Sequence, residues 1–157
     1  MNPRIISYRD RLDNLYRKTS TISDQNDRKE WSKYLCVLTS GWIEESLRTL
    51  LNDYARFNAS PKIQHYVSKE IDNITNCKTD KIIQILSKFD AEWGKQFEEK
   101  IDNRSPIHRE IKDSIDTVVA NRHRIAHGRS VGMTYTRISG FYNYCKTAIE
   151  VLDEIIA

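Results

Sequence analysis

The sequence predicts an all-α fold, and three observations support that prediction. Apolar residues recur at intervals of three and four positions along nearly the whole chain, which is the spacing of one helix face. No stretch shows the sustained alternation of apolar and polar residues that is typical of a strand. Only five glycines and three prolines are present, so few positions interrupt a helix.

Two helices are expected in the first third of the chain. The first covers residues 2–19, and the polar stretch 19–27 is expected to form a loop. The second covers residues 28–58, and its apolar stripe drifts slowly because the true period is 3.6 residues. The stripe residues are Ile5, Tyr8, Leu12 and Leu15 in the first helix, and Trp31, Leu35, Leu38, Trp42, Ile43, Leu47, Leu50, Tyr54 and Phe57 in the second.

Shorter helices are expected to follow. Ser60 as an N-cap and Pro61 at the first helical position predict a helix that continues to about residue 74. Two more short helices are expected over 79–89 and 91–101, before a polar loop at 102–105.

Two longer helices are expected to complete the chain. Ser105-Pro106 repeats the cap-then-proline signal and predicts a helix over 106–127. Gly128 stands where a left-handed residue would end that helix. A short loop at 128–134 then leads to a helix over 135–156. The stripe residues are Ile107, Ile111, Ile115, Val118 and Ile125, then Ile138, Phe141, Cys145, Ala148, Leu152 and Ile155.

Length and composition predict one domain over residues 1–157. A chain of 157 residues can bury one hydrophobic core, and 39% apolar with 30% charged residues is typical of a globular domain. The N-terminus lacks a signal-peptide pattern, and no apolar run reaches the roughly 20 residues that span a bilayer. We therefore expect a cytoplasmic protein that does not enter the membrane.

Charge and cysteine content narrow the possible functions. The 25 Lys and Arg residues against 22 Asp and Glu give a net charge of +3, which permits a nucleic-acid partner without requiring one. Cys36, Cys77 and Cys145 are far apart and form no CxxC motif. We expect buried free thiols, not a disulfide framework or a cysteine zinc site.

Arg122 is a polar residue on an apolar stripe. It lies one heptad after Ile115 and four residues after Val118, so it faces the same way as the core residues of its helix. A guanidinium needs partners when it is buried, so Arg122 either pairs with an acid or faces a polar cleft or an interface. The alternative is that its head reaches solvent near the helix end.

Glu45 is the acid expected to face the interior. It lies one heptad after Leu38, on the stripe of the long second helix, which suggests a pair with Arg122. The alternative is that each residue is solvated separately. Glu44 is less informative, because it can pair with Arg48 at i, i+4 on a surface.

His123 and His127 are four residues apart, a spacing that could chelate a metal on a helix. The glutamate of HExxH is missing and no third ligand is evident, so no metal site is expected. His127 is either a C-cap histidine that favours the helix dipole or an acid–base catalyst. On an ideal helix Arg122 and His127 lie about 140° apart, so they converge only if the helix ends at His127 or a second subunit contributes.

Five basic residues crowd this helix end: Arg122, His123, Arg124, His127 and Arg129. They form either a helix C-terminus with favourable cations or a phosphate-binding patch.

The segment 120–128 (ANRHRIAHG) resembles the signature of HEPN domains, in which an Arg is followed by four to six residues and a His near one helix end. Here the match is Arg122, four residues and His127. The segment 39–48 (TSGWIEESLR) also looks like the RiboL-PSP-HEPN subgroup, and the pattern of helices fits over about residues 30–156.

The resemblance implies a HEPN-type helical bundle, with additional short helices, that dimerises and brings two such motifs together across a cleft. Many HEPN domains are metal-independent RNA endonucleases of toxin–antitoxin, antiviral defence or RNA-processing systems, and others only bind RNA or a partner protein. His123 stands where many active members have Asn, Asp or Ser, and it could supply the same polar contact. Arg129 replaces the Tyr that is adenylylated in some related toxins, so that regulation is not expected.

The leading hypothesis is therefore RNA cleavage through attack of the 2′-hydroxyl, without a cofactor. Arg122 would hold the phosphate, and His127 would act as general base or general acid. Glu45 would orient Arg122 or a histidine. Arg124, Arg129 and Arg48 are expected to bind flanking phosphates. The expected partners are RNA, a second copy of the chain and an antitoxin or operon partner.

Two alternatives remain. The first is a dimer that binds RNA or a partner protein without chemistry. The second is a purely structural helical dimer, in which Arg122 and Glu45 form an interface ion pair.

Overall fold

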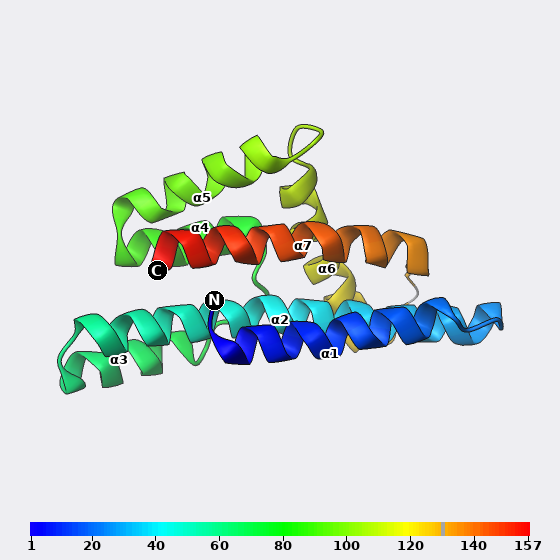
Figure 1. Ribbon diagram of the computed structural model, residues 1–157, viewed down its shortest axis with the longest axis horizontal. Helices are drawn as coiled ribbons and strands as arrows, with labels where there is room; N and C mark the ends of the chain where they lie inside the picture. Colours follow the sequence, from blue (N-terminus) through cyan, green and yellow to red (C-terminus); the bar gives the residue numbers. More distant parts are fainter. Residues whose placement is uncertain (130) are drawn as a thin grey trace.

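The computed structural model describes residues 1–129 and 131–157, and seven helices with no strand make up this part of the chain (Figure 1). The all-α prediction is confirmed. The helices are α1 (Pro3–Ser20), α2 (Gln25–Asn58), α3 (Pro61–Ile71), α4 (Thr79–Phe89), α5 (Ala91–Arg104), α6 (Glu110–Ala126) and α7 (Tyr135–Ile156). The loop expected at 128–134 includes residue 130, which lies outside the described residues.

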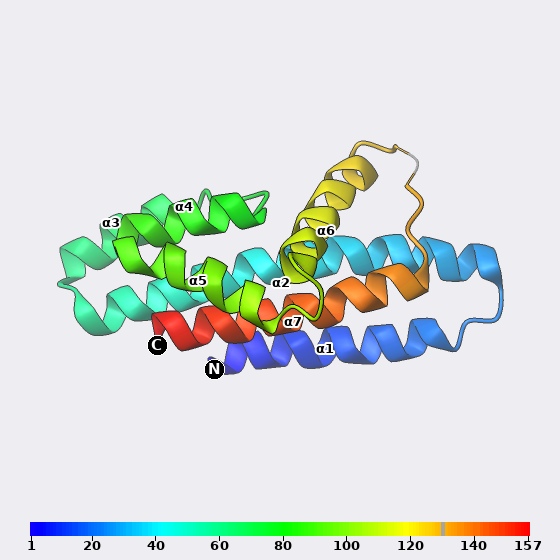
Figure 2. The same ribbon diagram turned by 90° about the horizontal axis from the view of Figure 1, so that it is seen from above.

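Three long helices form the body of the molecule. Helix α1 runs antiparallel to α2 and α7, and all three lie side by side in both views (Figures 1 and 2). Helix α3 folds back along the end of α2, and the hairpin of α4 and α5 packs against α7. Helix α6 crosses the body and contacts both α2 and α7.

Aromatic side chains join the three long helices in the core. Trp42 is 1% exposed, and its indole N–H donates to the carbonyl oxygen of Ile5 over 3.2 Å. The rings of Tyr16 and Tyr142 stack at 4.2 Å, and the Tyr142 hydroxyl donates to Asp13 over 2.6 Å. A buried aromatic with a satisfied polar group fixes the relative position of helices as well as filling space.

Local capping explains where the structure departs from the expected boundaries. Helix α2 begins at Gln25, three residues early, because the Asp24 side chain accepts a hydrogen bond from the Asp27 N–H (2.9 Å). Helix α6 begins at Glu110 instead of residue 106. The reason is Arg109, whose left-handed backbone (φ 65°) prevents the preceding turn from joining the helix.

Other boundaries shift by a few residues. Helix α3 ends at Ile71 instead of about residue 74, and α5 continues to Arg104, into the expected loop. Some expected stripe residues lie at the surface. Near the two ends of α2, which the bundle leaves partly uncovered, these are Trp31 (43% exposed), Tyr54 (36%) and Phe57 (75%); Ile107 (70%) lies in the turn before α6.

The three cysteines are free and buried, as expected. Burial raises the pKa of the Cys36 and Cys77 thiols to about 12, and that of Cys145 also rises. Within residues 1–129 and 131–157, no helix is both long and apolar enough to cross a bilayer.

Candidate functional site

Helix α6 ends where Gly128 predicts. Gly128 has φ +68°, its N–H donates to Ile125 (3.0 Å), and the N–H of Arg129 donates to Arg124 (2.9 Å). These two bonds form a Schellman motif, which satisfies carbonyls that the helix end leaves free. His127 is thereby the C-cap, with φ −93° and ψ 13°.

The last turns of α6 leave the body of the molecule. The helix buries five residues up to Val119, but none of residues 120–129 is fully buried. Figure 2 shows this end of α6 pointing away from α2 and α7. The Arg-x4-His motif therefore lies on a projecting helix end that another molecule can approach.

Arg122 is half-buried and faces a polar neighbour. Its Nη1 donates to the side-chain oxygen of Asn76 at 3.5 Å, a long hydrogen bond. Among the described residues it forms no ion pair with an acid. The sequence left open whether Arg122 pairs with a buried acid or faces polar groups. The structure shows that it faces a polar group, Asn76.

The acid that faces inward on α2 is Glu44, and the expectation for Glu45 is wrong. Glu44 is 7% exposed, whereas the Glu45 side chain is 50% exposed and pairs with Arg48 at 3.0 Å. The two acids are reversed relative to the expectation because Leu38, the reference for the heptad count, is itself only partly buried and lies on the same outer side of α2 as Glu45. No hydrogen bond or ion pair joins Glu45 to Arg122 in the described part of the chain.

Glu44 binds the loop between α3 and α4. Its Oε1 accepts a hydrogen bond from the backbone N–H of Asn76 (3.0 Å), and its Oε2 lies 3.3 Å from the guanidinium of Arg48. Arg48 also donates to the carbonyl oxygen of Ile74 (2.9 Å). Arg48 was expected to bind flanking phosphates. Its guanidinium instead forms a hydrogen bond with the loop and ion pairs with Glu44 and Glu45.

Asn76 is the site residue that the sequence argument missed. Its backbone is left-handed (φ 51°). Its side-chain oxygen accepts a hydrogen bond from Arg122, and its backbone N–H donates one to Glu44. Asparagine tolerates this conformation better than most residues, so an Asn in a polar loop was the available signal. The signal does not indicate which helices the loop would contact.

The two histidines lie next to each other on the surface. The rings of His123 and His127 are 4.4 Å apart between centroids, and both residues are exposed. In the described chain no carboxylate is hydrogen-bonded to either ring, and no group of three or more potential metal ligands is found. No hydrogen bond joins Arg122 to His127 in residues 1–129 and 131–157, so the chain alone does not bring them together.

Arg124 and Arg129 are exposed and form no ion pair with other described residues. Arg124 lies at the edge of an open depression of about 450 Å³ that also includes Arg137 and two acids, Asp113 and Asp116. The exposed guanidinium groups of Arg124 and Arg129 are accessible to an anionic partner.

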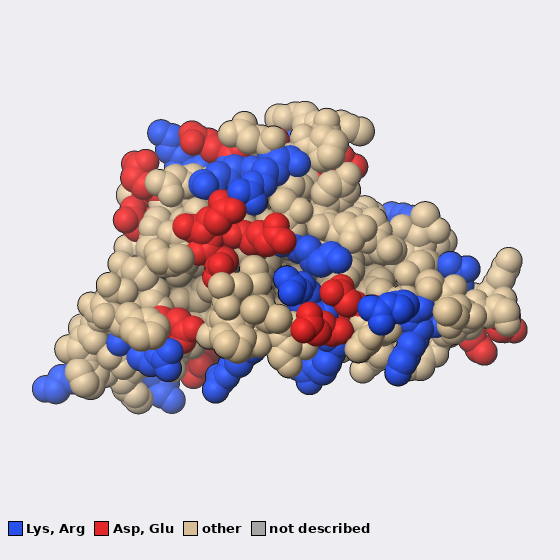
Figure 3. Space-filling view, viewed as in Figure 1, with Lys and Arg blue, Asp and Glu red and all other residues tan. Residues whose placement is uncertain are grey.

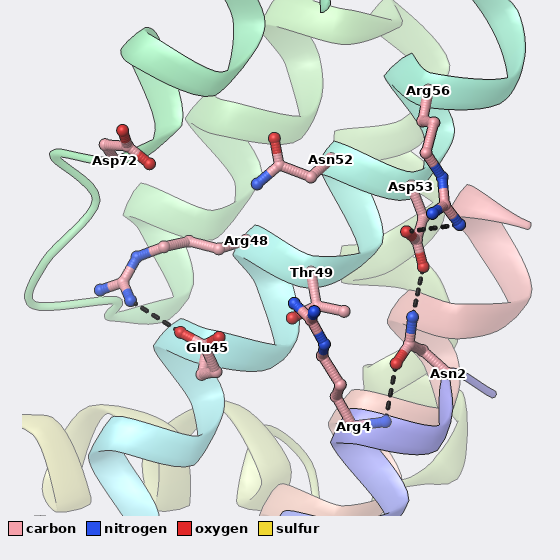
Figure 4. Close-up of a pocket in the computed structure, with 9 residues that line it drawn as sticks. All are labelled: Asn2, Arg4, Glu45, Arg48, Thr49, Asn52, Asp53, Arg56 and Asp72. Carbon is pink, nitrogen blue, oxygen red and sulfur yellow. Dashed lines mark hydrogen bonds and ion pairs between the residues drawn. The ribbon is translucent and has the colours of Figure 1, made fainter.

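Arg48 also borders a polar pocket of about 400 Å³ on the surface of α1 and α2 (Figure 4). The pocket is lined by Asn2, Arg4, Glu45, Arg48, Thr49, Asn52, Asp53, Arg56 and Asp72. Three acids balance the three arginines, and the pairs Glu45–Arg48 and Asp53–Arg56 (3.3 Å) are already formed. This balance gives the pocket no preference for phosphate.

The face shown in Figure 3 does not offer a basic surface either. Basic and acidic side chains are interspersed there over α5, α7 and α1. Ion pairs join them, as between Arg104 and Glu154 (2.6 Å) and between Lys146 and Asp13 (3.5 Å). At the end of α6, by contrast, Arg124 and Arg129 form no ion pair with other described residues.

A helical bundle with an Arg-x4-His motif at an exposed helix end defines a domain of the HEPN type. The family model RiboL-PSP-HEPN matches residues 4–157, and the chain belongs to this family. No curated protein and no solved structure matches the chain. Membership in a HEPN-type family links the chain to nuclease or RNA-related functions.

Proposed function

We propose that the chain is a metal-independent endoribonuclease that uses Arg122 and His127. The observation that carries the proposal is the projecting end of α6, which carries both residues. Arg124 precedes His127 there and Arg129 follows it. A guanidinium binds phosphate through several directed hydrogen bonds, and an imidazole can donate or accept a proton.

In the proposed reaction, a base removes the proton of the ribose 2′-hydroxyl, and the 2′-oxygen forms a bond to the adjacent phosphorus. The bond from phosphorus to the 5′-oxygen breaks, and an acid protonates that oxygen. The products are a 2′,3′-cyclic phosphate and a 5′-hydroxyl. Arg122 stabilises the charge that develops on the phosphoryl oxygens, and His127 transfers a proton.

The proposed active form is a dimer joined near the end of α6. Arg122 forms a hydrogen bond with Asn76 in the loop before α4, whereas His127 is the C-cap of α6 and forms no hydrogen bond with Arg122 in the described chain. A second copy would supply the missing His127 beside Arg122, and the unburied residues 120–129 would form part of the interface. We place such an enzyme in the cytoplasm, in a defence or toxin–antitoxin setting with a neutralising partner protein.

Cleavage of RNA in EDTA tests the proposal directly. The protein is incubated with single-stranded and structured RNA, beside the Arg122→Ala and His127→Ala variants, and the product ends are analysed. We expect cyclic phosphate ends from the native protein, loss of cleavage in both variants, and no cleavage of DNA. Cleavage that persists in either variant would refute the assignment.

Mixing the two inactive variants tests the dimer. If each site combines Arg122 of one protomer with His127 of the other, a heterodimer holds one intact site. An equal mixture then regains about a quarter of the native activity, because half of the dimers are mixed and each has one of two sites. No recovery after exchange of subunits would place both residues of a site in one protomer.

A non-catalytic dimer that binds RNA or a partner protein is the second candidate. The exposed imidazoles favour it, since no carboxylate in the described chain orients either ring for proton transfer. Under this alternative intact RNA binds with an affinity that falls with salt, and no cleavage occurs at any protein concentration.

A further inference from the structure

We propose that Asn76 is a positioning residue that holds the guanidinium of Arg122 ready for a phosphate. The proposal rests on the proposed function, because it assigns Asn76 a task in that same site. The observation behind it is the contact from Arg122 Nη1 to Asn76 Oδ1 (3.5 Å), made by a residue 46 positions away on a different element.

The loop that carries Asn76 is fastened on both sides. On the α2 side, the buried carboxylate of Glu44 accepts the Asn76 N–H at 3.0 Å. On the α6 side, the N–H of Thr79 donates to Asp116 at 2.8 Å, six residues before Arg122. Cys77, the next residue in the loop, is fully buried. Asn76 is thus fixed relative to α6, which is what a positioning contact requires.

The backbone of Asn76 directs its side chain. Its left-handed conformation (φ 51°) lets the N–H point to Glu44 while the amide group reaches Arg122. Asparagine adopts this conformation at a small cost, and glycine adopts it freely. A glycine at this position therefore keeps the loop and removes only the side chain.

A neutral acceptor suits this task better than an acid does. The Asn76 oxygen occupies one N–H of Arg122 and leaves four donors and the full positive charge for a phosphate. The nearby acid, Glu44, is engaged by Arg48 and by the Asn76 backbone. A carboxylate at position 76 would instead pair with Arg122 and compete with the phosphate.

The Asn76→Gly variant tests the proposal, with Asn73→Gly as the matched control in the same loop. Asn73 is exposed, and its side chain makes no hydrogen bond to the described residues. We expect Asn76→Gly to lower kcat/KM for RNA cleavage by about threefold to tenfold, the range for one hydrogen bond, while Asn73→Gly stays at the native value. Asn76→Asp should raise KM more than Asn76→Gly does.

A second measurement does not depend on activity. The order parameter of the Arg122 Nε–H bond, from ¹⁵N relaxation, should fall in Asn76→Gly and remain native in Asn73→Gly. An unchanged order parameter, or native kcat/KM in Asn76→Gly, would overturn the positioning role. If the native protein cleaves no RNA, the proposed function fails, and the order parameter alone still decides whether Asn76 holds Arg122.

Discussion

Glu44 and Glu45 are adjacent glutamates in the same helix, and we expect the two Glu→Ala variants to differ sharply in stability. Helix propensity changes equally at both positions, so the difference between them reports only the contacts of the carboxylates. Glu44 is 7% exposed and holds the backbone of Asn76 (3.0 Å) and the Arg48 guanidinium (3.3 Å). Among the described residues, the Glu45 carboxylate forms an ion pair with Arg48 only, from a half-exposed position.

The contacts set the expected magnitudes. A hydrogen bond to a buried charged group contributes about 1.5–3 kcal/mol, and removing Glu44 also leaves the Asn76 N–H without its acceptor. Glu44→Ala should therefore lower the free energy of unfolding by about 2–4 kcal/mol, including a discount for the partly exposed Arg48. Glu45→Ala should lower it by less than about 1 kcal/mol, as for other surface pairs.

Urea unfolding followed by circular dichroism at 222 nm measures both values, with Glu44→Gln as an additional variant. Glutamine keeps one acceptor for the Asn76 N–H, so its effect should lie between those of alanine and the native residue. Equal destabilisation by Glu44→Ala and Glu45→Ala would refute the assignment of Glu44 as the anchor of the loop before α4.

Two further predictions concern the helix end and the thiols. Gly128→Ala should destabilise the fold by about 1–2 kcal/mol through backbone strain, because φ is +68° and, apart from its chain neighbours, no atom of the described residues lies within 4 Å of the added Cβ. Gly140→Ala in α7 also has open space and should instead stabilise the protein by about 0.5–1 kcal/mol, as measured by thermal unfolding. Cys36 and Cys77 have pKa values of about 12 in the folded state, so unfolded thiols ionise first as the pH rises above about 9. The free energy of unfolding should fall over that range, and Cys36→Ala should reduce the slope.

The sequence predicts the helices well, because their signals are local. Pro61 and Gly128 act within one turn of the helix ends that they set, and the apolar spacing repeats along each helix. The start of α6 departs most from the expectation. The proline signal at 105–106 predicts a helix from residue 106, but Arg109 adopts a left-handed conformation that no local preference of arginine indicates.

The site is harder to predict, since its contacts join elements far apart in the chain. Arg122 and His127 are predicted from their spacing together with the helix end and the Gly128 that follows, all of which are local signals. Assigning the acid on α2 requires knowing which face of that helix meets the loop before α4, and the heptad count starts from Leu38, which is only partly buried. Asn76 has no pattern of its own, because its importance comes only from the two helices that it contacts.

The two residues of the motif are held in different ways, and this difference bears on the proposed mechanism. Arg122 is tied through Asn76 and Glu44 to the body of the fold, so its position depends on long-range packing. His127 is set by the Schellman end of α6, and its ring lies beside that of His123 on the same helix without a hydrogen bond or ion pair to the other described residues. A mutation in the core should therefore disturb phosphate binding before it disturbs the histidine. The imidazole, in turn, should gain its orientation only when a second protein surface covers the end of α6.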